Sequence, residues 1–410
     1  MIRPLVLLFT LLVSATPVHA EVDWLSPSTF SGLLDLRASA ADGESSWLAG
    51  GLGKTRVSGD DPRVDVGEAD LAWRPHFGFD WSALVEAEIQ PDHEHGPGIG
   101  EAYLQYKPMA FDGWRPMVRA GLFYPPISLE NAGSFWTPTE TITPSAINSW
   151  IGEEVKVLGA EASLRRDFGE QSVGATLGLF GFDNTAGTLL ATRGWSLDDV
   201  RDDSNDRYNL PHLSPFLNMV QPPNTVPVLE IDHRVGVYGR LDWRPVSNLA
   251  LNATYYDNRG DPTSLDEDGY WGWRTRFWNA GAIYQLDDKT RLLAQVMSGN
   301  TRMGFASPDI WVNTDFDAAY LMATRTIGED SVSARADVFS TTDRTSAVFG
   351  RTQENGWALT ADYRKAFNAH VSGLIELMHV ESDRPARADV LGEAAFQRQT
   401  VAQAALRLSF

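Results

Sequence analysis

The chain has 410 residues, of which 43% are hydrophobic, and it contains no cysteine. This composition excludes a bundle of apolar membrane-spanning helices and a scaffold held by disulfides. Lysine and arginine total 34 against 54 aspartate and glutamate residues, so the formal net charge is -20 and binding to nucleic-acid phosphates is not expected.

The first 20 residues have the pattern of a secretory signal peptide. Arg3 precedes an apolar run from Leu5 to Val13, and a small-residue ending at Ala20 is typical of a cleavage site. The apolar run is too short to cross a bilayer as a helix, which needs roughly 20 residues. We therefore expect cleavage after residue 20 and a mature chain, residues 21–410, that works outside the cytoplasm.

Apolar and polar residues alternate in long segments of the mature chain. In the clearest segment, from Phe77 to Gln90, nearly every odd position is apolar, which predicts one strand with Val85 facing lipid and Glu86 facing inward. A strand that crosses a bilayer needs about 9 to 11 residues, whereas strands of soluble proteins average about 5 or 6. The same rule places Phe316, Ala318, Tyr320 and Met322 of a later strand on the lipid side. The last strand ends at the terminal residue, Phe410.

The connections between predicted strands alternate in length. The longer ones lie near residues 39–63, 91–98, 126–157, 182–233, 258–272, 299–311, 341–355 and 382–396. Short periplasmic turns and long outer loops are typical of outer-membrane barrels. The pattern predicts one all-β domain, a transmembrane antiparallel β-barrel of about 16 strands that closes so that backbone groups in lipid are paired. Barrels of that size leave an aqueous channel.

Charged residues on the inward faces are candidates for lining the channel. The acidic candidates are Asp70, Glu86 and Glu88, and the basic candidates for recognising an anion such as phosphate are Arg119, Arg240 and Arg335. Acids gather on the early strands and arginines on several later ones. One hypothesis is a field across the channel that orients dipolar solutes, and the other is a wall that the charges merely keep wet.

The third long connection, residues 126–157, combines large apolar residues with glutamates. A loop exposed to water has no need of Phe135, Trp136 and Trp150. We predict that this connection folds against the inner wall as a constriction loop, with packing on neighbouring loops or on another subunit as the alternative. The glutamates assigned to the constriction are Glu130, Glu140, Glu153 and Glu154.

The stretch Gly121-Leu122-Phe123-Tyr124-Pro125-Pro126-Ile127-Ser128-Leu129-Glu130 resembles one that follows a middle strand in the phosphate-selective porin O and P family. The resemblance implies a homotrimeric porin of the bacterial outer membrane, with a loop constriction, passive diffusion of small hydrophilic solutes or ions, and a preference for anions or phosphate. That family commonly has a lysine where this chain has Tyr124, which leaves a general, cation-leaning channel open.

The expected partners follow from the same interpretation. They are outer-membrane lipid and lipopolysaccharide, small solutes or ions, and the barrel assembly machinery. The terminal Phe410 looks like the assembly signal of outer-membrane barrels.

The competing class is an outer-membrane barrel enzyme of protease or lipase type. Such chemistry needs a serine or an acid paired with histidine near the membrane rim. The available histidines, His212, His233, His370 and His379, lie in no recognisable motif, so we expect no enzymatic activity, catalytic residue or cofactor.

Two clusters have the residue types that bind metals. They are Asp92-His93-Glu94-His95 and, in the expected outer loop 182–233, the aspartates Asp198, Asp199, Asp202, Asp203 and Asp206. The first cluster is typical of a solvated outer loop. The aspartates, and Asp266, Glu267 and Asp268 in another loop, do not follow the spacing of a calcium-binding EF-hand loop, so no metal site is predicted, although bound calcium in the acidic loops stays open.

Overall fold

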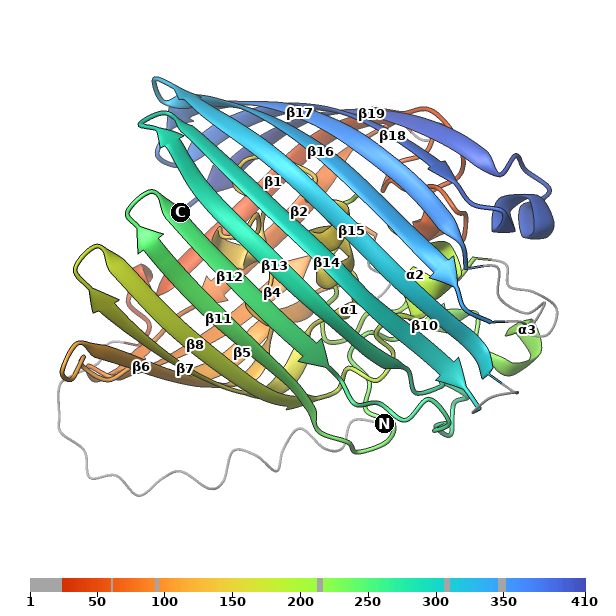
Figure 1. Cartoon of the computed structure of the whole chain (residues 1–410). Coiled ribbons are helices and arrows are strands. Elements are labelled where there is room, and N and C mark those ends of the chain that lie inside the picture. Colours follow the sequence, from red (N-terminus) through yellow and green to blue (C-terminus); the bar gives the residue numbers. More distant parts are fainter. Residues whose placement is uncertain (1–23, 60–61, 93–95, 212–216, 306–309, 346–351) are drawn as a thin grey trace.

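The computed structural model describes residues 24–59, 62–92, 96–211, 217–305, 310–345 and 352–410, and the predicted signal peptide lies outside these residues. The chain forms a closed antiparallel barrel of 16 strands, which confirms the predicted fold class (Figure 1). Successive strands pair with each other around the barrel, and the short β3 continues β2 alongside β4, so β2 and β3 count as one of the 16 strands.

The strands of the barrel are β1 (Phe30–Ala41), β2 (Arg63–Trp73), β3 (His76–Phe77), β4 (Trp81–Ile89), β5 (Gly98–Tyr106), β6 (Trp114–Phe123), β7 (Val157–Phe168), β8 (Gln171–Gly181), β11 (Gly236–Val246), β12 (Leu249–Asp257), β13 (Arg274–Asp287), β14 (Thr290–Gly304), β15 (Ile310–Ile327), β16 (Asp330–Asp343), β17 (Glu354–Asn368), β18 (Val371–Asp383) and β19 (Phe396–Ser409). The connections add a two-stranded sheet of β9 (Tyr208–Asn209) and β10 (Asn224–Thr225), and the helices α1 (Ala146–Glu154), α2 (Thr188–Arg193) and α3 (Leu217–Val220). Single helical turns lie at Pro27–Thr29, Trp47–Ala49, Ser134–Trp136 and Arg387–Leu391.

The barrel closes between its first and last strands. β1 pairs with β19 from Leu33↔Ser409 to Ala41↔Val401. Gly32 and Phe410 exchange both backbone hydrogen bonds, at 3.1 and 3.2 Å, so the terminal residue completes the seam. A Cβ on Gly32 would lie 2.3 Å from the Phe410 ring, which explains why a glycine stands there. The role of Phe410 as an assembly signal stays a prediction.

The outer surface carries the apolar face of the strands. Leu241, Trp278 and Ile375 are all more than 60% exposed on this surface, although each is large and apolar. Such a face is suited to lipid, because the sheet has already paired the backbone groups. None of the described helices is long and apolar enough to cross a membrane.

The predicted continuous strand from Phe77 to Gln90 is wrong, because the chain turns within it. Phe77 pairs with Trp81 across a tight turn, and Gly78 has a φ of 79° there. Glycine adopts this left-handed conformation without a steric penalty. The alternation continues through both arms of the turn, so periodicity alone did not reveal the break. Within β4 the predicted register is correct, since Val85 is 37% exposed and Glu86 only 2%.

The predicted orientation of the strand around residue 316 is also wrong. Phe316, Ala318, Tyr320 and Met322 point into the barrel and are buried, whereas Leu321 is 57% exposed. The reason is that the inner wall at β15 contacts the apolar helix α1 instead of water. Both faces of β15 are therefore apolar over its middle part, and alternation does not distinguish them.

The outward position of Val85 gives the first prediction. Val85→Arg should lower the free energy of unfolding by about 2 to 4 kcal/mol, the cost of placing arginine on the lipid face near mid-bilayer. Urea unfolding of the protein in lipid vesicles, followed by tryptophan fluorescence, measures this change. Val85→Ala is the control for lost packing, and an equal effect of both substitutions would contradict the register.

Candidate functional site

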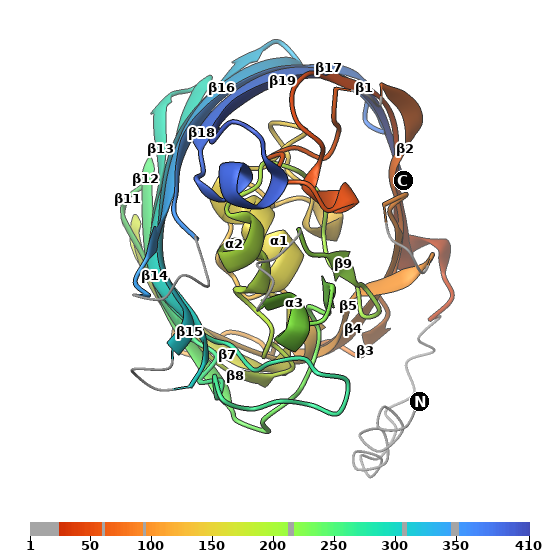
Figure 2. The ribbon, with the colours of Figure 1, turned by 90° about the vertical axis from the view of Figure 1, so that its right-hand side faces the viewer.

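Two long segments of the described chain run inside the barrel. The first inward segment, residues 124–156, contains α1, and the second inward segment, residues 182–203, contains α2 (Figure 2). All residues from 141 to 156 are buried, and so are nearly all from 183 to 203. The second inward segment was predicted as part of an outer loop. Its apolar run, with Leu189, Leu190, Trp195 and Leu197, is the signal that pointed inward.

Helix α1 carries the apolar contact between the first inward segment and the wall. Ser145 caps its N-terminus, with the side-chain oxygen accepting a hydrogen bond from the Asn148 amide at 3.4 Å. Trp150 is fully buried, and its ring centroid lies 5.5 Å from that of Phe277 on β13 and 5.1 Å from that of Phe316 on β15. Trp195 of the second inward segment packs against the same ring at 6.0 Å. One tryptophan thus joins both segments to the wall.

The three arginines predicted to recognise an anion hold the backbone of the first inward segment. Arg119 donates to the carbonyl of Tyr124 at 3.1 Å, and Arg240 donates to the carbonyl of Pro126. Arg335 donates to the carbonyls of Thr143 and Pro144 at 2.7 and 2.8 Å. These carbonyls lie at both ends of a long irregular stretch, which therefore follows the wall.

Each of these arginines also pairs with a carboxylate on the wall. Arg119 contacts Glu161 at 3.0 Å, Arg240 contacts Asp242 at 2.6 Å, and Arg335 contacts Asp337 at 2.8 Å. A phosphate ligand would have to displace these carboxylates, because one guanidinium fork binds one such partner well.

All four glutamates assigned to the constriction form ion pairs or accept hydrogen bonds. Glu130 contacts Arg335 at 3.0 Å, Glu140 contacts Arg291, and Glu153 contacts Arg193 of the second inward segment. Glu154 accepts from the amides of Gly187 and Leu189 at 3.0 and 2.8 Å, at the N-terminus of α2. A carboxylate is favoured there because the first amides of a helix have no partner within the helix. Glu153 and Glu154 therefore connect the two inward segments.

Asp70, Glu86 and Glu88 form an acidic wall on β2 and β4 that the second inward segment covers. Arg201 reaches this wall and contacts Asp70 at 3.3 Å and Glu88 at 3.2 Å, together with Glu68 at 2.6 Å. All four acids are at most 6% exposed. Asp70, Glu86 and Glu88 thus face the interior, and their role in lining a solute path stays a prediction.

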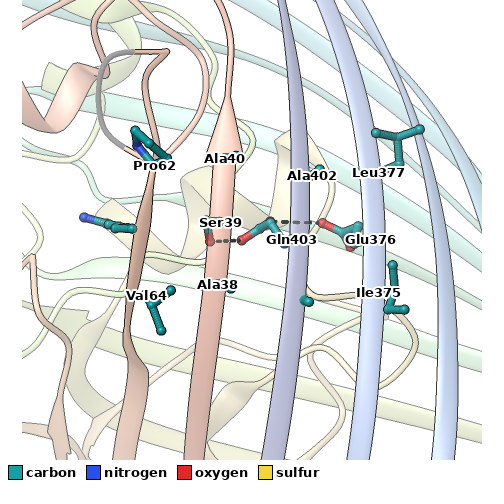
Figure 3. Close-up of a pocket in the computed structure, with 12 residues that line it drawn as sticks. Ala38, Ser39, Ala40, Pro62, Val64, Ile375, Glu376, Leu377, Ala402 and Gln403 are labelled. Carbon is teal, nitrogen blue, oxygen red and sulfur yellow. Dashed lines mark hydrogen bonds between the residues drawn. The ribbon is translucent and has the colours of Figure 1, made fainter.

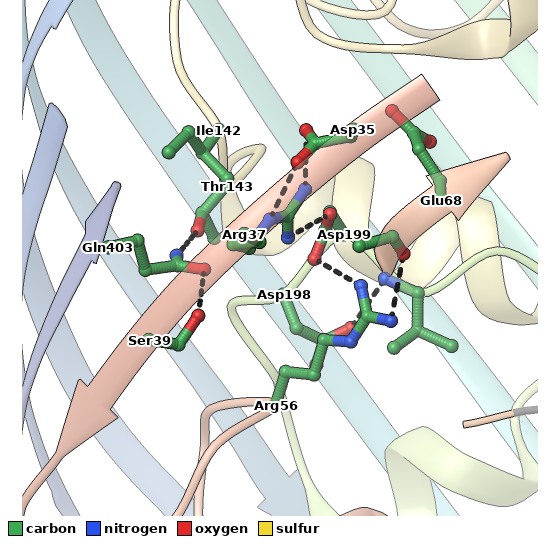
Figure 4. Close-up of polar contacts among 12 residues, drawn as sticks. Asp35, Arg37, Ser39, Arg56, Glu68, Ile142, Thr143, Asp198, Asp199 and Gln403 are labelled. Carbon is green, nitrogen blue, oxygen red and sulfur yellow. Dashed lines mark hydrogen bonds and ion pairs between the residues drawn. The ribbon is translucent and has the colours of Figure 1, made fainter. Parts of the chain in front are cut away.

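The aspartates expected in an outer loop are buried inside the barrel, which corrects that prediction. Asp199 lies between Arg37 and Arg56, at 2.5 and 3.1 Å (Figure 4). The two guanidinium groups hold the pKa of Asp199 far below its usual value, against the effect of burial. Asp202 accepts from the Tyr124 hydroxyl at 2.7 Å and lies 3.4 Å from the Lys156 ammonium group. Arginine and lysine side chains thus engage two of the five carboxylates that were considered for calcium.

Tyr124, the position where the resembled family has lysine, lies beside a lysine from elsewhere in the chain. The Lys156 ammonium group is 4.6 Å from the centroid of the Tyr124 ring, and the Trp136 ring stacks on Tyr124 at 4.4 Å. Tyr124 and Lys156 stand at the two ends of the first inward segment, so this contact closes the segment at its base.

No protein-family model and no curated protein matches the chain. Solved structures match it over almost its whole length. An anion-selective porin from Comamonas acidovorans has a TM-score of 0.55 and 13% sequence identity, and the match covers 93% of this chain and 99% of that one. The outer membrane channel DcaP of Acinetobacter baumannii and OmpF of Salmonella typhi each match with a TM-score of 0.52 and 10% identity, over 93% of this chain and 96% and 97% of theirs.

The chain has the fold of a bacterial outer-membrane porin. At these identities the likeness concerns the fold, and it does not confirm the phosphate-selective family.

Among the candidate histidines in the described residues, His379 is the one whose ring contacts other side chains. His212 and residues 93–95 lie outside them, and Asp92 pairs with Arg56 and Arg63. His379 on the outer surface of β18 contacts the Thr400 hydroxyl at 2.9 Å and Glu381 at 3.4 Å. His379 and Thr400 lie opposite each other on the paired strands β18 and β19. The backbone amides of these strands already bond within the sheet, so they are not available to stabilise an oxyanion. The described part of the chain also has no group of three metal-type side chains.

An open groove crosses the seam of the barrel on its outer surface (Figure 3). The side chains of Ala38, Ala40, Ala402 and Ala404 form its floor, and Ile375, Leu377 and Val64 border it. The polar neighbours Ser39 and Gln403 point to the other side of the sheet, where their side chains contact each other at 3.4 Å. The groove therefore belongs to the lipid-facing surface and is separate from the interior.

The position of Trp150 predicts how the segments respond when their shared contact is removed. Trp150→Ala should weaken the docking of both segments by about 3 to 5 kcal/mol, the usual cost of deleting a buried aromatic side chain. The expected result is an increase of at least twofold in single-channel conductance, measured in planar bilayers. Trp278→Ala, on the lipid face, is the matched control and should leave conductance unchanged. No change in Trp150→Ala would show that these segments do not limit the pathway.

The buried carboxylate of Glu154 predicts a pH dependence. Burial raises the pKa of Glu154 from 4.5 to about 6, and the hydrogen bonds to α2 offset only part of this effect. Because the docked state disfavours the charged form, docking should be strongest below pH 4.5, weaken as the pH rises to about 6, and change little above it. Glu154→Gln should weaken this dependence without abolishing it, because burial also raises the pKa of Asp202 to about 6.

Cysteine labelling can measure this effect, because the chain has no cysteine of its own. Ala191→Cys places one thiol in buried α2, and Thr263→Cys places one on an exposed loop. The rate of maleimide labelling at 191 relative to 263 should rise between pH 4.5 and 6. A constant ratio would contradict the prediction, since the reference thiol corrects for the intrinsic pH dependence of the reaction.

Proposed function

We propose that this protein is a channel for the passive diffusion of small hydrophilic solutes or ions across the bacterial outer membrane. The observation that supports the proposal is a 16-strand barrel whose interior holds two chain segments attached by side-chain contacts. Barrels of 16 to 18 strands are wide enough for an aqueous channel. The inward segments then determine its width, since they occupy the same space as the solute.

The contacts that hold the inward segments are suited to reversible movement. Most are hydrogen bonds and ion pairs, such as Arg335 to Glu130 and Arg201 to Glu68. Water that enters as a segment moves rehydrates the separated charges and replaces the lost hydrogen bonds, so the net cost is lower than that of separating the same pairs in a dry interior. A pathway that opens when a segment moves is therefore physically reasonable for this barrel.

The proposal does not include selectivity for phosphate. A phosphate site needs several cationic donors that are free to converge on one ligand. Arg119, Arg240 and Arg335 are each engaged by a carboxylate and by backbone carbonyls, as described above. We propose instead that the channel prefers cations, because the wall on β2 and β4 has more carboxylates than cationic partners. The homotrimer, lipopolysaccharide and the assembly machinery remain predictions from the resemblance.

Planar-bilayer recording of the purified protein tests the channel. Stable, stepwise currents in potassium chloride are expected, and protein denatured by boiling serves as the control. Absence of stable channels from correctly folded protein would refute the proposal.

The zero-current potential in a salt gradient tests the preference for cations. Its sign should correspond to potassium permeating faster than chloride, and Arg240→Gln should not alter the effect of added phosphate. A potential of the opposite sign, or a block by phosphate that depends on Arg240, would support the anion-selective alternative.

A further inference from the structure

On the described inner wall of β2 and β4, carboxylates outnumber the cations that contact them. We define the acidic pocket as Glu68 and Asp70 on β2, Glu86 and Glu88 on β4, and the backbone of Gly100 on β5 beside them. Arg201 enters from the second inward segment and contacts three of the four carboxylates, at 2.6 to 3.3 Å. The next cation, Lys156, is engaged by Asp202.

Several oxygen atoms of the acidic pocket have no partner among the described residues. One oxygen each of Glu68, Asp70 and Glu88 is buried without a hydrogen bond. Glu86 is 2% exposed and makes no hydrogen bond or ion pair with the described chain. Leaving buried charged groups unpaired is costly, so an arrangement with this many open acceptors is suited to a further donor.

Glu86, which has no partner in the described chain, and Glu88, which Arg201 binds through Oε2, meet beside Gly100. Glu86 Oε1 and Glu88 Oε2 each lie 3.0 Å from the position that a Cβ on Gly100 would take. A Cβ at position 100 would crowd both oxygens, so glycine lets the two carboxylates come together there. The unpartnered Glu86 is therefore directed at the same place as a carboxylate that already binds the Arg201 guanidinium.

We propose that the acidic pocket is a binding site for small organic cations that carry a guanidinium or primary ammonium group, and that Arg201 occupies this site in the closed arrangement. A guanidinium presents up to five N–H donors in one plane, which matches several carboxylates at once. Arg201 already shows this mode of binding, since its two terminal nitrogens serve three different carboxylates. A solute with the same group meets the same acceptors and, in addition, the free Glu86.

The proposal deepens the proposed channel function, on which it rests, by naming the class of solute. Arg201 belongs to the second inward segment, which is held against this wall by non-covalent contacts. A cationic solute that takes the acidic pocket displaces Arg201 and so frees the second inward segment from β2 and β4. Recognition of the solute and widening of the path would then be one event.

Isothermal titration calorimetry of the purified protein in detergent tests the site without requiring a current. The probe is methylguanidinium, and tetramethylammonium is the comparison because it has the same charge but no N–H donor. Arg201→Gln, which vacates the pocket, should bind methylguanidinium at least tenfold more tightly than the unmodified protein. Tetramethylammonium should bind at least tenfold more weakly than methylguanidinium to the same variant.

Matched variants separate the pocket from general effects. Arg201→Lys keeps a cation in the pocket and should bind as weakly as the unmodified protein. Arg56→Gln loosens the same segment at Asp199 without emptying the pocket, and it too should bind weakly. Adding Glu88→Gln to Arg201→Gln should reduce methylguanidinium binding at least tenfold. If Arg201→Gln does not fold, methylguanidinium should still raise the labelling rate of Ala191→Cys in the otherwise unmodified chain.

Three results would overturn the proposal. They are equal binding of both cations, equal binding by Arg201→Gln and the unmodified protein, and no binding at all, which would mean that protons alone neutralise the pocket. Stable channels in bilayers together with any of these results would leave the channel function intact and refute only the cation site.

Discussion

The rest of the structure depends on one constraint, the pairing of every backbone amide and carbonyl within a lipid environment. A sheet satisfies it only by closing on itself. Here closure uses the two ends of the described chain, since β1 pairs with β19 and Gly32 exchanges both backbone hydrogen bonds with Phe410. Closure with 16 strands then fixes a wide interior, which side chains of the wall alone do not fill. The two inward segments occupy that space, and their own backbone groups need partners there, which is why Arg119, Arg240 and Arg335 donate to main-chain carbonyls.

The buried ion pairs between wall and segments contribute more to position than to stability. Removing two charges from water costs several kcal/mol per ion, and the attraction between them often does little more than offset this cost. Such pairs raise the free energy of any other position of the segments, because a displaced segment leaves unpaired charges on the wall. Arg335 illustrates this, since it is fully buried and bound at the same time to Asp337 on its own strand and to Glu130 on the segment. If the segment left, Arg335 would keep one partner, so the interior is built to tolerate at least partial release.

The sequence predicted the strands whose two faces meet different surroundings, and failed where the surroundings are alike. On β4 and β16 one face meets lipid and the other meets charged groups, so alternation correctly placed Val85 outward and Arg335 inward. On β15 both faces are apolar, because α1 covers the inside, and the rule that apolar means lipid gave the wrong side. The second inward segment was missed for a related reason, since its aspartates resemble those of a hydrated loop until their partners are known. Those partners are distant in sequence: Asp199 pairs with Arg37 on β1, and no local pattern links the two.

The pairing of charges also decides between the two hypotheses for the lumen. A field across the channel needs acids on one wall and bases on another that remain uncompensated. Yet Arg119 faces Glu161 on the neighbouring strand, Arg240 lies against Asp242, and Arg335 against Asp337, all at hydrogen-bond distance. Two opposite charges this close act as a short dipole, whose field decays much faster with distance than that of a single charge. The field of these arginines is therefore largely cancelled by their neighbouring carboxylates.

The charge of the acidic wall is cancelled only in part, because Arg201 is shared among three carboxylates and Glu86 has no partner in the described chain. What survives on β2 and β4 is a local excess of negative charge, and the net charge of -20 does not reveal it, because much of that charge is already paired inside the barrel.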